Sequence, residues 1–213
     1  MATSKKTSPR KQTASPGVSA STSQGGYSVP GMDPQAGVMV AGVLQNRLNA
    51  LQDLHLTLKH VHWNVVGPNF IAVHQMLDPQ VDAVRAMVDD TAERIATLGS
   101  SPIGTPGALV AQRTWEDYSL ARATTVEHLG ALDVVYSGVI SDHREAIETV
   151  SDPDPVSEDL LVGQSAQLEL FHWFVRAHLE GSSGQLSTAG ETTEKGAARK
   201  AAAAVGQKVG PAT

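Results

Sequence analysis

Four residues between positions 74 and 93 combine metal-ligand chemistry with helical spacing. His74 and Asp78 lie four residues apart, and Asp89 and Glu93 repeat that spacing further along the chain. Residues four apart share one face of an α-helix. Imidazole and carboxylate groups bind iron and similar transition metals. The segment therefore predicts two half-sets of ligands on one helix, with a solvated acidic face as the alternative.

The two half-sets cannot reach one ion within a single chain. Asp78 and Asp89 are eleven residues apart, which in an α-helix is about 20° beyond three full turns and about 16 Å of rise. A metal–ligand bond is roughly 2 Å long. Two such helices packed antiparallel about a two-fold axis near Val84 would place His74 and Asp78 of one chain opposite Asp89 and Glu93 of the other. This hypothesis predicts two identical composite sites per dimer.

Pro79 gives Asp78 a second interpretation. A proline inside a helix removes a backbone hydrogen bond, whereas Asp-Pro is also a good start for a helix, with the aspartate as its N-cap. Asp78 could therefore cap a helix that begins at Pro79, which would leave its relation to His74 undetermined.

Other histidines offer further candidates. His62 and His55 lie seven residues apart on one apolar stripe, and we interpret His55 as a core histidine. Glu169 and His172 form a Glu-x-x-His motif, which di-iron bundles carry on two helices. This chain has one such motif, so we predict structural roles for Glu169 and His172 and disfavour a di-iron oxygenase.

Helical periodicity accounts for most of the chain that could position these residues. Four segments show it: about 35–65, 70–98, 120–150 and 156–179. Gly-Pro, Gly-Ser-Ser-Pro and Asp-Pro-Asp-Pro sequences separate them. The pattern predicts an all-α four-helix bundle with one long crossover over about 99–119, which carries a short helical turn over 114–118.

Composition limits the classes of protein to which the chain can belong. It has 213 residues, 41% of them hydrophobic, which is enough for one packed domain. It contains no cysteine, so disulfides, thiolate nucleophiles and zinc–thiolate sites are excluded. The N-terminus lacks the apolar segment of a signal peptide, and no apolar run approaches the length of a membrane span. We therefore expect a cytoplasmic protein without membrane contact.

Charge divides the chain into an acidic body and two basic ends. Residues 1–30 carry a net charge of +4, residues 31–180 of −12 and residues 181–213 of +2, within the overall net charge of −6. Residues 1–33 are rich in Ser, Thr, Gly and Pro and show no periodicity. We predict a disordered basic N-terminal tail over 1–33, the bundle over 34–180 and a flexible basic C-terminal tail over 181–213.

One long motif resembles the mini-ferritin family called DNA-binding protein from starved cells (Dps): HVHWNVVGPNFIAVHQMLDPQVDAVRAMVDDTAERIATLG, residues 60–99. The shared features are His-Trp, a second His twelve residues later, an Asp four beyond it, and then Asp-x-x-x-Glu. The resemblance extends over residues 40–180, through DLHLTLKHVHWN, GTPGALV, TWEDYS and WFVRAHLE, and is closest to actinobacterial members with extended tails. It implies a ferritin-like four-helix bundle that assembles into a hollow dodecameric shell.

The resemblance also implies the chemistry. Members of the family oxidise Fe(II) at sites between two-fold-related subunits, preferably with hydrogen peroxide, and store ferric mineral inside the shell. Carried over by position, the ferroxidase ligands are His62, His74 and Asp78 of one subunit with Asp89 and Glu93 of its neighbour. The resemblance thus implies two iron ions per intersubunit site, in agreement with the two-chain geometry.

Iron entry and DNA binding are two further expectations. The family admits iron through acidic pores on three-fold axes, and the candidate lining residues here are Asp152, Asp154, Glu158 and Asp159. A solvated turn with acidic residues at a helix N-terminus is the alternative. The basic ends predict non-specific DNA binding, strengthened by many copies on one particle. The candidate DNA contacts are Lys5, Lys6, Arg10, Lys11, Lys195, Arg199, Lys200 and Lys208.

The expected function is therefore iron oxidation and storage that protects DNA from oxidative damage, in a cytoplasmic, nucleoid-associated particle. The alternative to DNA contact is that the tails only keep the particle in solution. The alternative for the whole protein is a nucleoid-packing DNA-binding protein with little ferroxidase activity.

Overall fold

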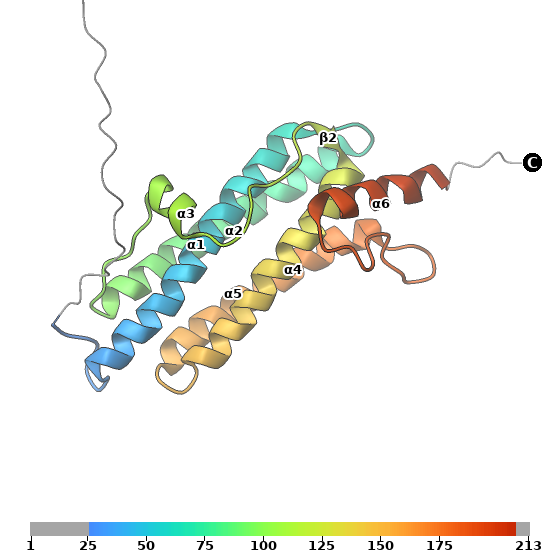
Figure 1. The fold of residues 1–213 in the computed structure, drawn as a ribbon. Coiled ribbons are helices and arrows are strands. Elements are labelled where there is room, and N and C mark those ends of the chain that lie inside the picture. The colour runs from blue at the N-terminus through green and yellow to red at the C-terminus, as the bar shows by residue number, and fades with distance from the viewer. Residues whose placement is uncertain (1–25, 208–213) are drawn as a thin grey trace, which may run out of the picture.

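The computed structural model describes residues 26–207, whose ordered elements are mainly helices (Figure 1). The four long helices are α1, Pro34–Asn64; α2, Phe70–Thr97; α4, Thr125–Val150; and α5, Pro155–Leu179. The short elements are helices α3, Pro106–Gln112, and α6, Glu194–Gln207, with strands β1, Val65–Val66, and β2, Ala123–Thr124. Five candidate DNA contacts lie outside the described residues: Lys5, Lys6, Arg10, Lys11 and Lys208.

The long helices form a four-helix bundle, as the apolar periodicity predicts. Helices α1 and α2 form one antiparallel hairpin, α4 and α5 form a second, and the two hairpins lie side by side (Figure 1). The crossover after α2 runs back along the bundle, and the parallel pairing of β1 with β2 attaches its end to the turn after α1. Within residues 26–207, no helix is both long enough and apolar enough to cross a membrane.

Buried aliphatic side chains from all four long helices form the core. One cluster contains Leu58 of α1, Leu77 of α2 and Leu132 of α4. A second cluster, which includes Leu44 and Ile95, joins the start of α1 to the end of α2. Full burial of one such side chain is worth about 1.5–3 kcal/mol. The core therefore holds α1 and α2, which carry the candidate ligands, in a fixed relation.

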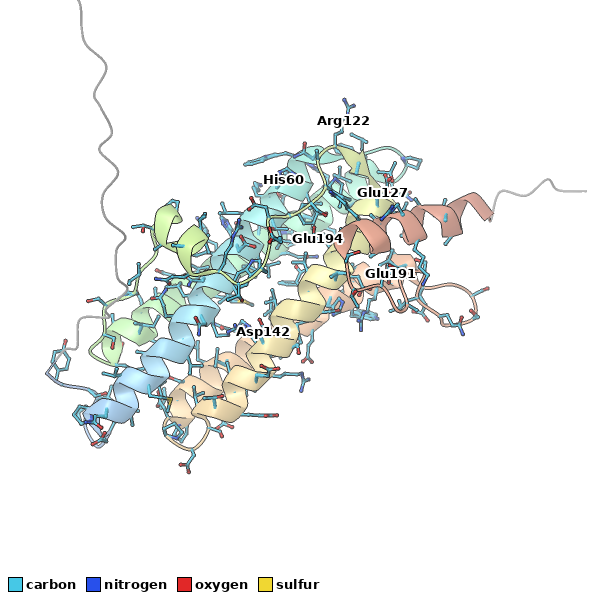
Figure 2. The ribbon with its side chains drawn as sticks, in the orientation of Figure 1. His60, Arg122, Glu127, Asp142, Glu191 and Glu194 are labelled. Atoms are coloured by element: carbon cyan, nitrogen blue, oxygen red, sulfur yellow. The ribbon has the colours of Figure 1, made fainter. Side chains whose placement is uncertain are left out.

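Polar caps set the helix ends. The Asp33 Oδ1 atom accepts hydrogen bonds from the backbone N–H groups of Gln35 and Ala36 at 2.9 and 3.1 Å. Helix α4 begins with a capping box, in which Glu127 accepts a hydrogen bond from the Thr124 backbone N–H at 2.8 Å (Figure 2). The bounds of α1, α2 and α5 match the predicted segments to within about two residues. Helix α4 begins later than predicted, because the capping box defines its start.

The crossover contains a short helix, but not where we predicted one. We predicted a helical turn over 114–118, whereas α3 precedes those residues and they are irregular. Pro106 occupies the first turn of α3, where a proline needs no N–H partner, so it starts a helix instead of ending one. After α3 the chain is held against α1, because Asp53 accepts hydrogen bonds from Arg113 at 3.2 Å and from Trp115 Nε1 at 2.8 Å.

The C-terminal segment contains an ordered helix, although we predicted a flexible tail over 181–213. Helix α6 lies across α4 (Figure 1). A Cβ atom added at Gly130 would lie 2.8 Å from the Ala197 carbonyl oxygen, so a side chain there would displace α6. Glu194 accepts a hydrogen bond from the Ser119 backbone N–H at 2.6 Å and ties α6 to the crossover (Figure 2). The predicted flexibility is therefore wrong for Glu194–Gln207.

A buried carboxylate anchors the segment that precedes α6. Asp133 of α4 accepts hydrogen bonds from His172 Nε2 at 2.7 Å, Arg176 Nε at 2.8 Å and Thr188 Oγ1 at 2.6 Å. Burial alone would raise the pKa of Asp133, but the three hydrogen bonds and the charge of Arg176 outweigh burial and lower this pKa. His172 and Arg176 belong to α5, so one aspartate joins α4, α5 and the C-terminal segment.

Replacement of Asp133 should release the C-terminal segment from the bundle. In the variant Asp133→Asn, the amide keeps one acceptor atom and has no charge to hold Arg176. Hydrogen bonds to a charged group contribute about 1.5–3 kcal/mol each, and the neutral amide loses that share of them. We expect much faster backbone hydrogen exchange across α6, measured by mass spectrometry, with little change in α1 and α2. The matched control is Glu148→Gln, an exposed position on the same helix. Unchanged exchange in α6 would contradict the anchoring role.

Candidate metal centre

Three side chains from the junction of α1 and α2 gather around one point. His62 lies in the last turn of α1, and His74 and Asp78 lie near the start of α2. One nitrogen or oxygen atom from each lies within 4.8 Å of the others, the one group of at least three potential ligands found within residues 26–207. Helix α2 continues through Pro79, so Asp78 does not cap a new helix and stands one turn from His74.

The two histidines are bound to each other's backbone. His62 Nδ1 donates to the carbonyl oxygen of His74 at 3.1 Å, and His74 Nδ1 donates to the carbonyl oxygen of His62 at 2.9 Å. Their rings stack with centroids 3.7 Å apart. Because a carbonyl oxygen only accepts, each Nδ1 carries a proton, and each Nε2 of the neutral ring keeps a lone pair for a metal ion. Hydrogen bonds of this kind fix the tautomer and orientation of a metal-binding histidine.

Asp78 completes the group from its solvent side. Its side chain is 49% exposed, and its Oδ1 atom lies 3.3 Å from His62 Nδ1 and 3.3 Å from Lys59 Nζ. Two imidazoles and one carboxylate suit Fe(II) and similar ions. The ammonium of Lys59 places a positive charge beside this carboxylate, and that charge opposes the approach of a cation.

The other two predicted ligands do not join this cluster. Asp89 and Glu93 are exposed on α2, about three turns or more beyond Asp78. Because α2 is one continuous helix, these carboxylates cannot approach the cluster of their own chain. One chain therefore holds His62, His74 and Asp78 together and presents the remaining two candidates to the solvent.

The acidic residues expected to line an entry pore divide into two groups. Asp154 is only 2% exposed, and its carboxylate accepts hydrogen bonds from Arg94 Nη2 at 2.7 and 2.8 Å and a further bond from Ser157 Oγ. Burial would raise the pKa of Asp154, but the hydrogen bonds from Arg94 and Ser157 lower it below its ordinary value. Asp154 therefore joins α2 to the start of α5 and cannot line a pore. The other candidates keep exposed surface: Asp152, Glu158 and Asp159.

The Glu-x-x-His pair has structural roles, as predicted. Glu169 forms an ion pair with Arg144 at 2.5 Å, whereas His172 binds Asp133. The two residues thus serve separate contacts within the described chain. His55 is half-buried on α1, which corrects our interpretation of it as a core histidine.

Three of the candidate DNA contacts near the C-terminus lie on helix α6, and not in a flexible tail as we predict from the sequence. Lys195, Arg199 and Lys200 are exposed on α6. Lys200 Nζ contacts the Ala189 carbonyl oxygen at 2.5 Å and Glu191 at 3.5 Å, so its charge is partly neutralised. Lys195 and Arg199 are four residues apart and share one face of the helix.

Comparison with known proteins shows which family resembles this chain. The family described as Ferritin, the ferritin-like domain, matches residues 42–183. The DNA protection during starvation protein of Mycolicibacterium smegmatis is 59% identical over 175 residues, which cover 82% of this chain and 96% of that protein. The structure of Mycobacterium smegmatis Dps matches with a TM-score of 0.78 at 58% identity, over 79% of this chain and 97% of that one. The structure of DpsA14 from Streptomyces coelicolor matches with a TM-score of 0.76 at 62% identity, over 76% of this chain and 97% of that one.

Removal of the Lys59 charge should strengthen metal binding at the cluster. In the variant Lys59→Met, the Asp78 carboxylate no longer has an ammonium group 3.3 Å away that repels an approaching cation. We expect Co(II), a stand-in for Fe(II) that is stable in air, to bind about tenfold more tightly. Titration calorimetry at pH 7 measures this affinity. The control Lys195→Met removes a cation from α6, and equal affinities for the two variants would show that Lys59 does not compete.

The pair of Arg94 and Asp154 should make stability depend on acid pH. The pKa of Asp154 is lower in the folded chain than in the unfolded one, so its contribution is present above about pH 4, the ordinary pKa of an aspartate. That contribution is lost as the pH falls through the folded pKa. We expect Asp154→Asn to lower the melting temperature by about 5 °C at pH 7 and by less below pH 4. Circular dichroism melts measure this, with Asp152→Asn as control. A difference from wild type that stays constant down to pH 3 would contradict the assignment.

Proposed function

The chain belongs to the Dps family of ferritin-like proteins, and we propose that it oxidises Fe(II) and stores the ferric product in a hollow oligomer. The observation that carries this proposal is the gathering of His62, His74 and Asp78 within 4.8 Å, with Asp89 and Glu93 exposed on the same helix as two of them. Iron is the substrate of this chemistry. Each chain supplies one half of two different sites.

A second copy of the chain provides the missing ligands in this proposal. Helix α2 packs antiparallel against its counterpart about a two-fold axis near Val84, so Asp89 and Glu93 of one chain face the cluster of the other. Two imidazoles and three carboxylates then surround each site and hold two ferrous ions. Exposed apolar side chains near the cluster support coverage by another chain, since Trp63 is 70% exposed and Ile71 is 58% exposed.

A pair of ferrous ions suits hydrogen peroxide as the oxidant. Each Fe(II) gives up one electron, and one peroxide molecule takes both electrons and two protons to become two water molecules. Delivery of both electrons at one site avoids hydroxyl radical, the product of one-electron reduction. The carboxylates of Asp78, Asp89 and Glu93 favour the ferric product, because anionic oxygen ligands stabilise the higher charge on the metal.

Storage requires a closed shell and an entry route for iron. The two-fold dimers assemble further in this proposal, into a dodecamer with an internal cavity. Exposed acidic residues raise the local concentration of cations at an opening between chains. Asp154 is excluded from such an opening because it is hydrogen-bonded to Arg94. The remaining candidates are Asp152, Glu158 and Asp159.

DNA contact runs through the basic ends in this proposal. Residues 31–180 carry a net charge of −12, so the bundle repels DNA phosphates. The cations Lys195 and Arg199 are exposed on α6, and many copies on one particle add avidity. Such contact places the particle at the nucleoid in the cytoplasm and brings iron oxidation beside the DNA that it protects. The alternative remains a DNA-packing protein with little ferroxidase activity.

Ligand complementation between chains tests the composite site. The variant H62A/H74A keeps Asp89 and Glu93, and the variant D89N/E93Q keeps the cluster of His62, His74 and Asp78. Each variant alone should oxidise Fe(II) with peroxide about a hundredfold more slowly than wild type. Co-expressed chains form mixed dimers with one complete site, so about a quarter of the wild-type rate should return. Stopped-flow absorbance of the ferric product measures these rates.

The controls make each outcome decisive. The variant H178A removes an exposed histidine outside the cluster and should keep the wild-type rate. Absence of recovery in co-expressed, assembled chains would show that the ligands are not shared between chains. A wild-type protein that shifts DNA in a gel but does not oxidise Fe(II) would favour the DNA-packing alternative.

A further inference from the structure

The exposed face of α2 carries more than the candidate ligands. At about 100° per residue, six titratable side chains fall within an arc of about 100° on this helix. They are His74, Asp78, Asp82, Arg85, Asp89 and Glu93, and none of them is buried within the described chain. Four of the six are ligands of the proposed composite site. Asp82 and Arg85 are the two titratable members of the face that the iron chemistry does not use.

The ligands determine which residues of two α2 helices oppose each other. His74 and Glu93 lie at equal distances on either side of one point of the helix, midway between Ala83 and Val84, and so do Asp78 and Asp89. An antiparallel two-fold packing that completes the sites must have its axis at that point, and residues equally distant from it then face each other. Asp82 and Arg85 are equally distant from it. The aspartate of each chain therefore opposes the arginine of the other.

We propose that Asp82 and Arg85 form two reciprocal ion pairs across the two-fold axis and set the register of the α2 dimer. This inference rests on the proposed function, because the composite site defines the position of the axis. Within residues 26–207, neither side chain forms a hydrogen bond or ion pair in its own chain, although both charges act on the half-buried His55. Both groups are therefore available to a second copy.

The ligands cannot specify this register by themselves before iron arrives. Asp78 of one chain opposes Asp89 of the other, so each empty site brings carboxylates together, and like charges at close range repel. The ion pairs of Asp82 and Arg85 lie between the two sites and are attractive without a metal. At the outer ends of the face, Ile71, which is 58% exposed, opposes the exposed Ala96 and adds an apolar contact. Partly covered ion pairs of this kind give an interface its specificity and register.

Exchange of charges between chains tests the pairing. The variant D82R places four guanidinium groups around the axis, and R85D places four carboxylates there. Each variant alone should weaken the two-fold contact and slow Fe(II) oxidation about tenfold or more. Co-expression of D82R with R85D should restore both properties, because the cations of one chain then meet the acids of the other. Each chain still carries like charges within its own helix, so recovery must come from across the axis.

Native mass spectrometry of full-length chains, one tagged and one untagged, measures assembly independently of activity. The control D90R makes the same charge change as D82R at an exposed position of α2 outside the arc. It should assemble as wild type and should not rescue R85D. Normal assembly of D82R and R85D alone would overturn the inference, and so would their failure to recover together. Loss of the oxidation rate in H62A/H74A with normal assembly reports on the proposed function alone, so the two proposals can fail separately.

Discussion

A continuous α-helix cannot bring residues three turns apart to one ion, and this constraint governs the molecule. Helix α2 is locked on its inner side by Leu77, Val84 and Ile95, which are buried in the bundle. Its outer side is therefore presented to the solvent as a rigid row of charged and imidazole groups. A rigid row that is incomplete in one chain can be completed only by another surface of matching spacing. The same helix, turned by a two-fold axis, is such a surface.

The cluster of His62, His74 and Asp78 is organised by contacts within the chain. The reciprocal hydrogen bonds of His62 and His74 to backbone carbonyls join the end of α1 to the start of α2, and the stacked rings restrict each other's rotation. A site whose ligands are already oriented loses little conformational entropy on binding. The carboxylates of Asp89 and Glu93 are exposed, which fits the role proposed for them as ligands of a second chain's site.

Local signals explain what the sequence could predict. Apolar periodicity and Gly or Pro breaks identified the four long helices, and the spacing of His74 and Asp78 within one helix needed no tertiary information. Contacts between distant residues explain what it could not predict. The sequence around Asp154 predicts an exposed acidic residue. In the structure Asp154 is buried, because it binds Arg94, which is sixty positions away in the chain. Helix α6 follows a segment that is joined to α4 by the hydrogen bond of Thr188 to Asp133, 55 positions away. The shared iron site stays a prediction. The described chain brings three of its five ligand candidates together and leaves Asp89 and Glu93 exposed.

The proline inside α2 leaves one main-chain oxygen of the helix without its usual donor. Pro79 has no N–H, so the carbonyl group of Gln75 lacks the hydrogen bond that a regular helix would supply four residues later. This oxygen lies between His74 and Asp78 along the helix. This oxygen belongs to the backbone, so it would remain there whatever side chain occupied position 75. Helix α2 thus has a backbone hydrogen-bond acceptor between His74 and Asp78, and no substitution of Gln75 can remove it.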